Sequence, residues 1–261
     1  MKLRGALVLM ALAVAGLPAS VSTPAGAIAL CFGEQSDIPL DGTYGDDVIH
    51  GTPGDDVIQT YDGNDVVYGG GGNDKICTMN GEDRVFGGAG ADQISGGEGR
   101  DVLRGGAGMD SLEGNEGNDV LYPGGGIGGY ADGGDGNDRI VINAAGDNDV
   151  FGGPGRDMID FRAAPTAITV DLSLGHYDSI WSPPAIGSLV FEVEKVRGSA
   201  YDDTIVGDSL GNRLMGMGGN DYLGGGSGND TLDGGDGWDV LDGGAGTNVC
   251  LNGEDLTSCA A

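Results

Sequence analysis

Positive charge, histidine and long hydrophobic runs are all scarce in this sequence. Only 12 Lys and Arg residues stand against 41 Asp and Glu residues in 261 positions, which gives a formal net charge of −29. A chain this acidic is repelled by nucleic acid and by anionic membrane surfaces, so neither is expected as a partner. The same charge favours cations as ligands.

Common catalytic motifs are also missing. The two histidines are His50 and His176, and the sequence contains neither the H-E-x-x-H motif of metalloproteases nor the G-x-S-x-G motif of serine hydrolases. Matches to G-x-G-x-x-G are trivial in a chain with 56 glycines, so they do not indicate a dinucleotide site. A glycosidase with paired carboxylates stays open on composition alone, because acids are abundant.

Hydrophobic residues form one long run, near the start of the chain. Lys2 and Arg4 precede the apolar stretch 6–17, which is too short to span a bilayer, and the small residues 25–27 fit a cleavage site. These features predict a Sec-type signal peptide over residues 1–27 and a secreted mature chain. No later apolar run is long enough to cross a membrane, so no span is expected in the mature chain.

Glycine and aspartate recur with a period of nine residues. Written in nines from Gly42, the chain gives nine consecutive rows that end at Tyr122, from "GTYGDDVIH" to "GNEGNDVLY". Position 4 is glycine, position 6 is aspartate and position 8 is Ile, Val or Leu in every row. Positions 7–9 therefore predict a short strand with one inward side chain. Positions 1–6 predict a turn in which glycine supplies positive φ values.

Less regular rows extend this pattern into two blocks. In the first block we interpret Asp132 and Ile142 as single inserted residues, and Gly128 as a glycine at position 6. In the second block asparagine replaces aspartate at position 6 in some rows. The predicted units are a first repeat block at 42–160, an irregular insertion at 161–197 and a second repeat block at 198–251.

This pattern resembles the glycine- and aspartate-rich nonapeptide repeat of RTX proteins, G-G-x-G-x-D-x-U-x. The resemblance covers both repeat blocks. It implies an all-β fold, a parallel β-roll (a β-solenoid) of stacked repeats with two repeats in each coil. It also implies multiple Ca²⁺ ions, each lying between two turns one coil apart. Backbone carbonyls and position-6 aspartates would hold them, and such hard oxygen donors suit Ca²⁺.

The position-6 aspartates are therefore the expected Ca²⁺ ligands. Sites around Asp65 and Asp83 are expected to be weak, because Thr60 and Thr78 replace the first glycine and resist positive φ. A site at Asp230 is expected to be weak too, since its position-6 neighbours on the same side are asparagines. The full set of expected ligands is Asp47, Asp56, Asp65, Asp74, Asp83, Asp92, Asp101, Asp110, Asp119, Asp138, Asp157, Asp203, Asp221, Asp230 and Asp239.

The stacking of aspartates predicts that folding depends on calcium. Aspartates on one side of the roll would lie about 4.8 Å apart, the spacing of neighbouring strands. Two carboxylates at that distance repel by about 3 kcal/mol at an effective dielectric constant of about 20. The core offers only one sizeable aliphatic side chain per row. We therefore expect the mature chain to be largely disordered without calcium and to fold on binding it.

Four cysteines lie in the predicted mature chain, which indicates two disulfides in a secreted protein. Sequence order suggests the pairs Cys31–Cys77 and Cys250–Cys259, one at each end, although four cysteines allow three pairings. Residues 28–41 are predicted to form an N-terminal cap. Residues 252–261 are predicted to form a C-terminal cap with a disulfide loop, which would protect the sheet edge.

The segment between the blocks has two stretches with strand-like alternation, 167–174 and 188–196. We expect it either to continue the stack as wider coils or to form a hairpin. Glu192 and Glu194 fall on one side of the second stretch, which is interpreted as a solvated face. The segment is too short for an independent catalytic domain.

Together these features predict a secreted calcium-binding repeat protein without enzymatic activity. Its role would be structural or adhesive, with cell-surface or matrix components as candidate partners. The alternative is a secreted calcium-dependent enzyme, for example a glycan-active one, with a site on the outer surface of the roll. An ice-binding surface would need a threonine ladder, which the position-9 residues of the first block do not form.

One feature departs from the best-known members of the family. RTX toxins and proteases leave the cell through a dedicated exporter and carry an uncleaved C-terminal signal. This chain instead has a Sec-type N-terminal pattern and resembles the Sec-exported relatives that consist of the repeats alone, so toxin activity is not inferred from the resemblance.

Overall fold

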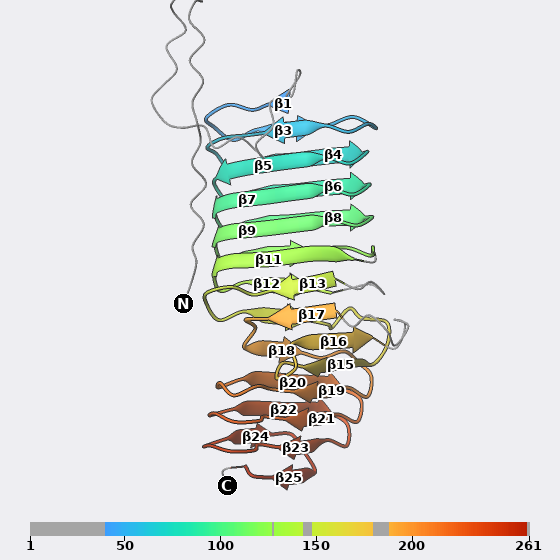
Figure 1. The fold of residues 1–261 in the computed structure, drawn as a ribbon, viewed down its shortest axis with the longest axis vertical. Coiled ribbons are helices and arrows are strands. Elements are labelled where there is room, and N and C mark those ends of the chain that lie inside the picture. Colours follow the sequence, from blue (N-terminus) through green and yellow to red (C-terminus); the bar gives the residue numbers. More distant parts are fainter. Residues whose placement is uncertain (1–39, 127, 143–147, 180–187, 260–261) are drawn as a thin grey trace, which may run out of the picture.

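The computed structural model describes residues 40–126, 128–142, 148–179 and 188–259. Over these residues the chain winds into a stack of coils that carries two long sheets (Figure 1). The fold is all-β, a parallel β-solenoid of the predicted kind. The predicted signal peptide and most of the predicted N-terminal cap lie outside the described residues. Within the described ranges, no helix is long and apolar enough to cross a membrane.

The two sheets take alternate strands from the chain. The 14-stranded sheet consists, in spatial order, of β1 (Leu40–Asp41), β3 (Val57–Gln59), β5 (Lys75–Asn80), β7 (Gln93–Gly99), β9 (Ser111–Gly117), β11 (Gly129–Gly136), β13 (Asn148–Phe151), β17 (Ser188–Phe191), β16 (His176–Ser179), β15 (Ile168–Asp171), β19 (Thr204–Val206), β21 (Tyr222–Gly224), β23 (Val240–Asp242) and β25 (Asp255–Thr257). The 11-stranded sheet consists of β2 (Val48–His50), β4 (Val66–Gly71), β6 (Arg84–Ala89), β8 (Val102–Ala107), β10 (Val120–Tyr122), β12 (Arg139–Val141), β14 (Met158–Asp160), β18 (Lys195–Arg197), β20 (Arg213–Gly218), β22 (Thr231–Asp236) and β24 (Val249–Leu251).

The nine-residue period sets the register of both sheets. Val57 pairs with Lys75 in one sheet and Val48 with Val66 in the other, so two rows make one coil as predicted. Several strands are longer than the predicted three residues. For example, β7 continues from position 7 of one row through position 4 of the next. The first positions of these turns are thus extended backbone that joins the ladder.

Position 8 forms the core, as the sequence predicts. The position-8 side chains point inward from both sheets and are fully buried from Ile58 through Leu241; among them are Ile58, Val67, Ile76, Val85, Ile94, Leu103, Leu112 and Leu121. Burial of one such aliphatic side chain contributes about 1.5–3 kcal/mol. The core is one residue wide, so its total contribution is modest for a chain of this length.

The extra residue in the first block is not Asp132. Tyr130 pairs with Ser111 and Asp132 with Glu113, so Asp132 is an ordinary position-9 residue. The extra residue lies earlier, in the turn that follows Tyr122, and Gly129 rather than Gly128 stands at position 6. A run of glycines gives no sequence marker for the site of an insertion, which explains the wrong assignment.

The insertion both continues the stack and forms a hairpin. β15 and β16 are antiparallel, as are β16 and β17, whereas β17 pairs in parallel with β13 and β15 in parallel with β19. On the other side, β14, β18 and β20 stay parallel. Three strands thus replace one in the 14-stranded sheet, and the wider interior is filled by large side chains.

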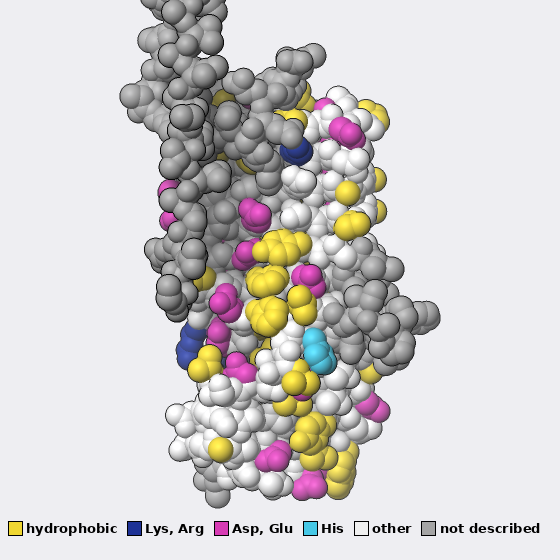
Figure 2. Space-filling view, in the orientation of Figure 1, with side chains coloured by type: hydrophobic (Ala, Val, Ile, Leu, Met, Phe, Trp, Pro, Cys, Tyr) yellow, Lys and Arg dark blue, Asp and Glu magenta, His cyan; other side chains and the backbone are white. Residues whose placement is uncertain are grey.

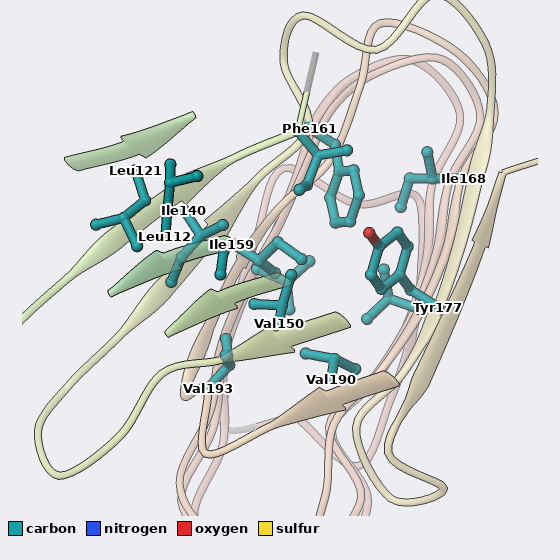
Figure 3. Close-up of a cluster of buried hydrophobic side chains, with 14 of the residues drawn as sticks. Leu112, Leu121, Ile140, Val150, Ile159, Phe161, Ile168, Tyr177, Val190 and Val193 are labelled. Atoms are coloured by element: carbon teal, nitrogen blue, oxygen red, sulfur yellow. The ribbon is translucent and has the colours of Figure 1, made fainter. Parts of the chain in front are cut away.

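Phe161 and Tyr177 are these side chains (Figure 3). Their rings meet edge to face with centroids 5.2 Å apart, between Ile168 and Val190. The Tyr177 hydroxyl donates to the carbonyl oxygen of Asn148 at 2.8 Å, which satisfies a buried polar group. The core is therefore continuous through the insertion.

The stretch 188–196 is two strands rather than one. It divides into β17 and β18, which belong to different sheets. Glu192, with φ of 56°, begins a short turn between them. The interpretation of Glu192 and Glu194 as one face of a strand was therefore wrong, because no glycine marks this turn in the sequence.

The C-terminal end carries the predicted disulfide. Cys250 and Cys259 are bonded, and β25 pairs with β23 to continue the 14-stranded sheet by one strand. The other predicted pair includes Cys31, which lies outside the described residues, so the Cys31–Cys77 pairing stays a prediction.

Candidate calcium sites

The position-6 aspartates stack in ladders along both edges of the solenoid. In each rung the backbone N–H of one aspartate donates to Oδ1 of the aspartate one coil further on, at 2.7–2.9 Å; examples are Asp74 to Asp92 and Asp83 to Asp101. Asp138 and Asp157 are joined in the same way despite the extra residue between them. The ladder therefore places every expected ligand of a stack in one row.

The second carboxylate oxygen of most of these aspartates has no partner. Oδ2 is buried without a hydrogen bond in twelve of the fifteen expected ligands, and their side chains are at most 2% exposed. An ionised carboxylate that is buried and unpaired is strongly unfavourable. The twelve are Asp65, Asp74, Asp83, Asp92, Asp101, Asp110, Asp119, Asp138, Asp157, Asp221, Asp230 and Asp239.

Glycine at position 1 leaves room beside this oxygen. A Cβ on Gly133 would lie 2.5 Å from Asp138 Oδ2 and 2.6 Å from the carbonyl oxygen of Gly152 in the next coil. The aspartate oxygen and a backbone carbonyl thus converge on the space that a side chain at position 1 would fill. Both are the hard oxygen donors that Ca²⁺ prefers.

Burial raises the pKa of these carboxyl groups. Desolvation is the main cause, neighbouring carboxylates add to it in most of them, and the N–H donor from the preceding coil opposes it. The pKa is about 7 for Asp101, Asp157 and Asp221, and about 6 for Asp74, Asp83, Asp119 and Asp138. The pKa values of Asp92, Asp110, Asp203 and Asp230 are raised as well. A bound cation would favour the charged form of each group.

Positive φ occurs at positions 2 and 4 of the regular turns, not at position 1. Thr60 and Thr78 at position 1 do not have positive φ, whereas the residues after them, Tyr61 and Met79, have φ of 73° and 70°. The stated reason for weak sites at Asp65 and Asp83 was therefore wrong. A different reason replaces it. The Thr60 and Thr78 hydroxyls donate at 3.1 Å and 2.8 Å to position-1 carbonyls of the next coil, which are the carbonyls available to a cation elsewhere. The weakness of these sites stays a prediction.

The first turn of each ladder is built differently. There the N–H at position 2 donates to the side chain at position 6 of the same turn, as from Thr43 to Asp47 and from Thr52 to Asp56, both at 2.6 Å. Ser199 donates to Asp203 at 2.6 Å in the same way. Oδ2 of these three aspartates therefore already has a partner, although the sequence does not distinguish them from the other expected ligands.

Asparagine and glycine interrupt the ladders. Asp230 lies between two asparagines in its row of hydrogen bonds. The backbone N–H of Asn212 donates to Asp230 Oδ1, and the side-chain oxygen of Asn248 accepts the N–H of Asp230. Gly129 provides no side chain to the rung after Asp110, and the amide of Asn148 beside it has no hydrogen-bond partner. The expected order of strong and weak sites follows from these replacements, since an amide keeps an oxygen donor but loses the charge.

Two glutamates that were not among the expected ligands also join the ladders. Glu194 Oε2 accepts the N–H of Asp157 at 2.8 Å, and Glu254 Oε2 accepts the N–H of Asp239 at 2.7 Å. Neither glutamate follows the nine-residue spacing, so the repeat gave no signal for them. The only available signal was an acid directly before a short strand.

The donor set depends on the backbone. Within the described ranges, no three His, Cys, Asp or Glu side chains gather around one point. A cation in these turns would be held by one or two carboxylates and several carbonyl oxygens. Such a set, without nitrogen or sulfur, fits Ca²⁺ and not Zn²⁺.

Residues that a surface enzyme would use are dispersed. The His50 ring stacks on Tyr68 with centroids 4.8 Å apart. The groove lined by residues 165–167 and 200–202 contributes one acid, Asp202. His176 lies on β16 of the 14-stranded sheet, within the insertion, whereas His50 lies on β2 of the 11-stranded sheet. No specific arrangement in the described parts of the chain favours the enzyme alternative.

In comparisons with known proteins, the chain matches the model of one protein family. The family model described as the RTX calcium-binding nonapeptide repeat (4 copies) matches residues 41–76, 78–108, 95–128, 144–160, 194–223 and 215–250. These matches cover more than half of the chain, in both predicted blocks. No curated protein sequence matches the chain significantly.

Proposed function

The chain belongs to the family of RTX calcium-binding nonapeptide repeat proteins, and on this basis we propose that it is a secreted protein that folds on binding several Ca²⁺ ions. Its role is structural or adhesive, outside the cell. The ions lie between stacked turns, where Asp Oδ2 and position-1 carbonyls converge.

The observation that carries this proposal is the row of twelve buried, unpartnered carboxylate oxygens. Without a cation, each rung places a charge in a desolvated position beside another carboxylate, and burial raises its pKa. A divalent ion between two turns reverses the sign of this interaction. The narrow core alone is a weak source of stability, so metal binding and folding are coupled.

Secretion is supported by the N-terminal sequence and by the Cys250–Cys259 disulfide, since such bonds persist in oxidising compartments. Calcium-dependent folding suits export, because the chain would stay unfolded where calcium is low. A structural or adhesive role is supported by the long, regular outer faces. Aromatic rings follow them in rows, such as Tyr130, Phe151 and Phe191 with centroids 5.4 and 5.5 Å apart. Figure 2 shows hydrophobic side chains running down one face between acids.

We also propose that the protein has no enzymatic activity. The position-6 acids have a use as ladder groups, and the remaining candidate side chains are dispersed. The cell-surface or matrix partner would then bind an outer face, not a cleft.

Far-UV circular dichroism of the mature chain, titrated with Ca²⁺ and separately with Mg²⁺, tests the proposal. We expect a cooperative change from coil to β with Ca²⁺ alone, near 10⁻⁴–10⁻³ M as for other extracellular modules. Mg²⁺ should fail because it requires stricter octahedral geometry and loses its water reluctantly. A fully β spectrum in a calcium chelator at pH 7.5 would contradict calcium-dependent folding.

A further inference from the structure

Two turns of the solenoid are only three residues long. Residues 192–194 connect β17 to β18, and residues 252–254 connect β24 to β25. Counted from position 9 of one row to position 7 of the next, a regular turn has six residues, positions 1–6, whereas each of these two turns has three. Register shows that Lys195 and Asp255 start their strands at position 7, opposite Met158 and Val240. The last residue of each short turn therefore stands at position 6.

That residue is glutamate in both cases. The carboxylates of Glu194 and Glu254 accept the N–H of the preceding position-6 aspartate, at 2.8 Å and 2.7 Å. The rungs between two aspartates make the same bond with aspartate Oδ1. A glutamate side chain is one methylene longer, and this added reach lets it make the rung from a shortened turn.

The preceding aspartates are in the same state as those of the regular sites. Asp157 and Asp239 are 0% exposed, and Oδ2 of each has no hydrogen-bond partner. A Cβ on Gly152 would overlap the carbonyl oxygen of Glu192, and a Cβ on Gly234 would overlap both Asp239 Oδ2 and the carbonyl oxygen of Asn252. The first residues of the short turns thus provide the carbonyls that position 1 provides elsewhere. Both have positive φ, 56° and 50°.

We propose that each short turn completes an additional calcium site. One site takes Asp157 Oδ2, the carbonyl of Glu192 and the carboxylate of Glu194. The other takes Asp239 Oδ2, the carbonyl of Asn252 and the carboxylate of Glu254. This inference rests on the proposed function, and it extends calcium binding to two turns that lack the nonapeptide motif.

The charge of the glutamates is the argument against a purely structural role. An amide is sufficient to accept the N–H of a rung, because Asn248 Oδ1 accepts the N–H of Asp230 at 2.9 Å. That ladder ends on a neutral group. The ladders through Asp157 and through Asp239 both end on a carboxylate instead, directly beside a buried carboxylate. Two negative groups at that spacing repel unless a cation lies between them.

The test is the number of calcium ions bound per mature chain, measured by equilibrium dialysis with atomic absorption at saturating Ca²⁺. Glu194→Gln and Glu254→Gln keep the oxygen that accepts the N–H and remove only the charge. Glu113→Gln is the matched control, because Glu113 lies at position 9 of β9 and contributes no group to either site. Far-UV circular dichroism in calcium verifies that each variant folds.

We expect each of the two variants to bind one ion fewer than the wild type, the double variant two fewer, and Glu113→Gln the same number. Unchanged stoichiometry in Glu194→Gln and Glu254→Gln would overturn the inference and leave the glutamates as hydrogen-bond acceptors alone. If Glu194→Gln did not fold, Glu254→Gln in the last coil would decide, since only β25 follows it. A wild-type chain that binds no calcium would instead refute the proposed function itself.

Discussion

Removal of calcium should make the stability of the fold depend steeply on pH. Burial, with the charges of Asp119 and Asp132 adding to it, raises the pKa of Asp138 from 3.8 to about 6. The folded state therefore binds its proton more tightly than the unfolded state. Stability without calcium is greatest below pH 3.8 for this group and is lost as the pH rises through about 6.

The Asp138→Asn variant measures the magnitude of this effect. A shift of about 2 pKa units corresponds to about 3 kcal/mol, which the charged form of Asp138 costs the calcium-free fold at neutral pH. Asparagine removes the charge, keeps an oxygen for the Asp119 N–H, and adds an amide that can donate to a position-1 carbonyl. Asn248 already does this, since its Nδ2 donates to Gly243 O at 2.6 Å.

The matched control is Asp135→Asn, three residues earlier on an exposed side chain. Far-UV circular dichroism of calcium-depleted protein would be followed from pH 4 to pH 8, with enough trimethylamine N-oxide to bring the transition into range. Asp138→Asn should move the pH of half-unfolding upward, and Asp135→Asn should leave it near that of the wild type. Equal shifts in both variants, or more β structure at pH 8 than at pH 5, would refute the reasoning.

Three other changes test separate parts of the structure. Gly69→Ala should lower the melting temperature in calcium, at a cost of about 1–3 kcal/mol from overpacking, because the added Cβ overlaps the aspartate of its own turn. The control Gly71→Ala should leave the melting temperature unchanged, because a Cβ at Gly71 has no neighbour nearer than 3.7 Å. Scanning fluorimetry of the two variants compares them, and equal losses would mean that position 1 has no special role. Cys259→Ser breaks the disulfide to Cys250, which closes a loop with a sequence separation of 9, and should cost up to about 3 kcal/mol of stability. Hydrogen exchange should then accelerate in β25 but not in β4 or β6. Uniform acceleration would contradict a local cap. Asp160→Asn removes the carboxylate that binds three arginines and should cost about 1.5–3 kcal/mol in urea unfolding at pH 7. Burial raises the pKa of Asp160, but the arginines outweigh it and hold that pKa below 3.8, so the difference from wild type should fade as the pH falls below 3.8.

The period of nine, together with the resemblance to the RTX repeat, was sufficient to predict most of the fold. A single aliphatic residue in each row, at position 8, determines which side chain of every short strand is buried. Two rows per coil then determine the register, and the register brings the position-6 aspartates into rows. Once the resemblance supplies the coil of two rows, the later steps follow from chain geometry, which explains why fold class, core and aspartate stacking agree with the structure.

Three features could not be predicted because the sequence gives no local marker for them. A run of glycines does not show which of them carries the extra residue, so Gly128 was placed where Gly129 stands. The turn at 192–194 lacks glycine and continues the alternation of the strands around it, so it was taken as strand. Glutamate in a shortened turn also departs from the spacing on which the ligand set was based.

The motif has glycine at positions 1, 2 and 4. The sequence does not show why glycine is needed at each position, but the structure shows two different reasons. At position 1 the structure requires space, since a side chain would meet the aspartate of its own turn. At positions 2 and 4 it requires positive φ. Threonine is therefore tolerated at position 1 only with its hydroxyl on the next carbonyl, whereas Tyr61 and Met79 must adopt an unfavourable backbone conformation.

That strain indicates what the turn is for. Four non-glycine residues at position 2, namely Tyr61, Met79, Asn115 and Met217, keep positive φ, which costs about 1–2 kcal/mol each. The aspartates of their turns all have an unpartnered Oδ2. In the first turns of the ladders, position 2 does not have positive φ, and its N–H donates to the position-6 side chain. Positive φ at position 2 thus turns the N–H away and leaves the carboxylate oxygen open. Backbone strain that prevents this hydrogen bond is expected where Oδ2 of the position-6 aspartate binds another partner. For a buried carboxylate, the partner that fits is a cation.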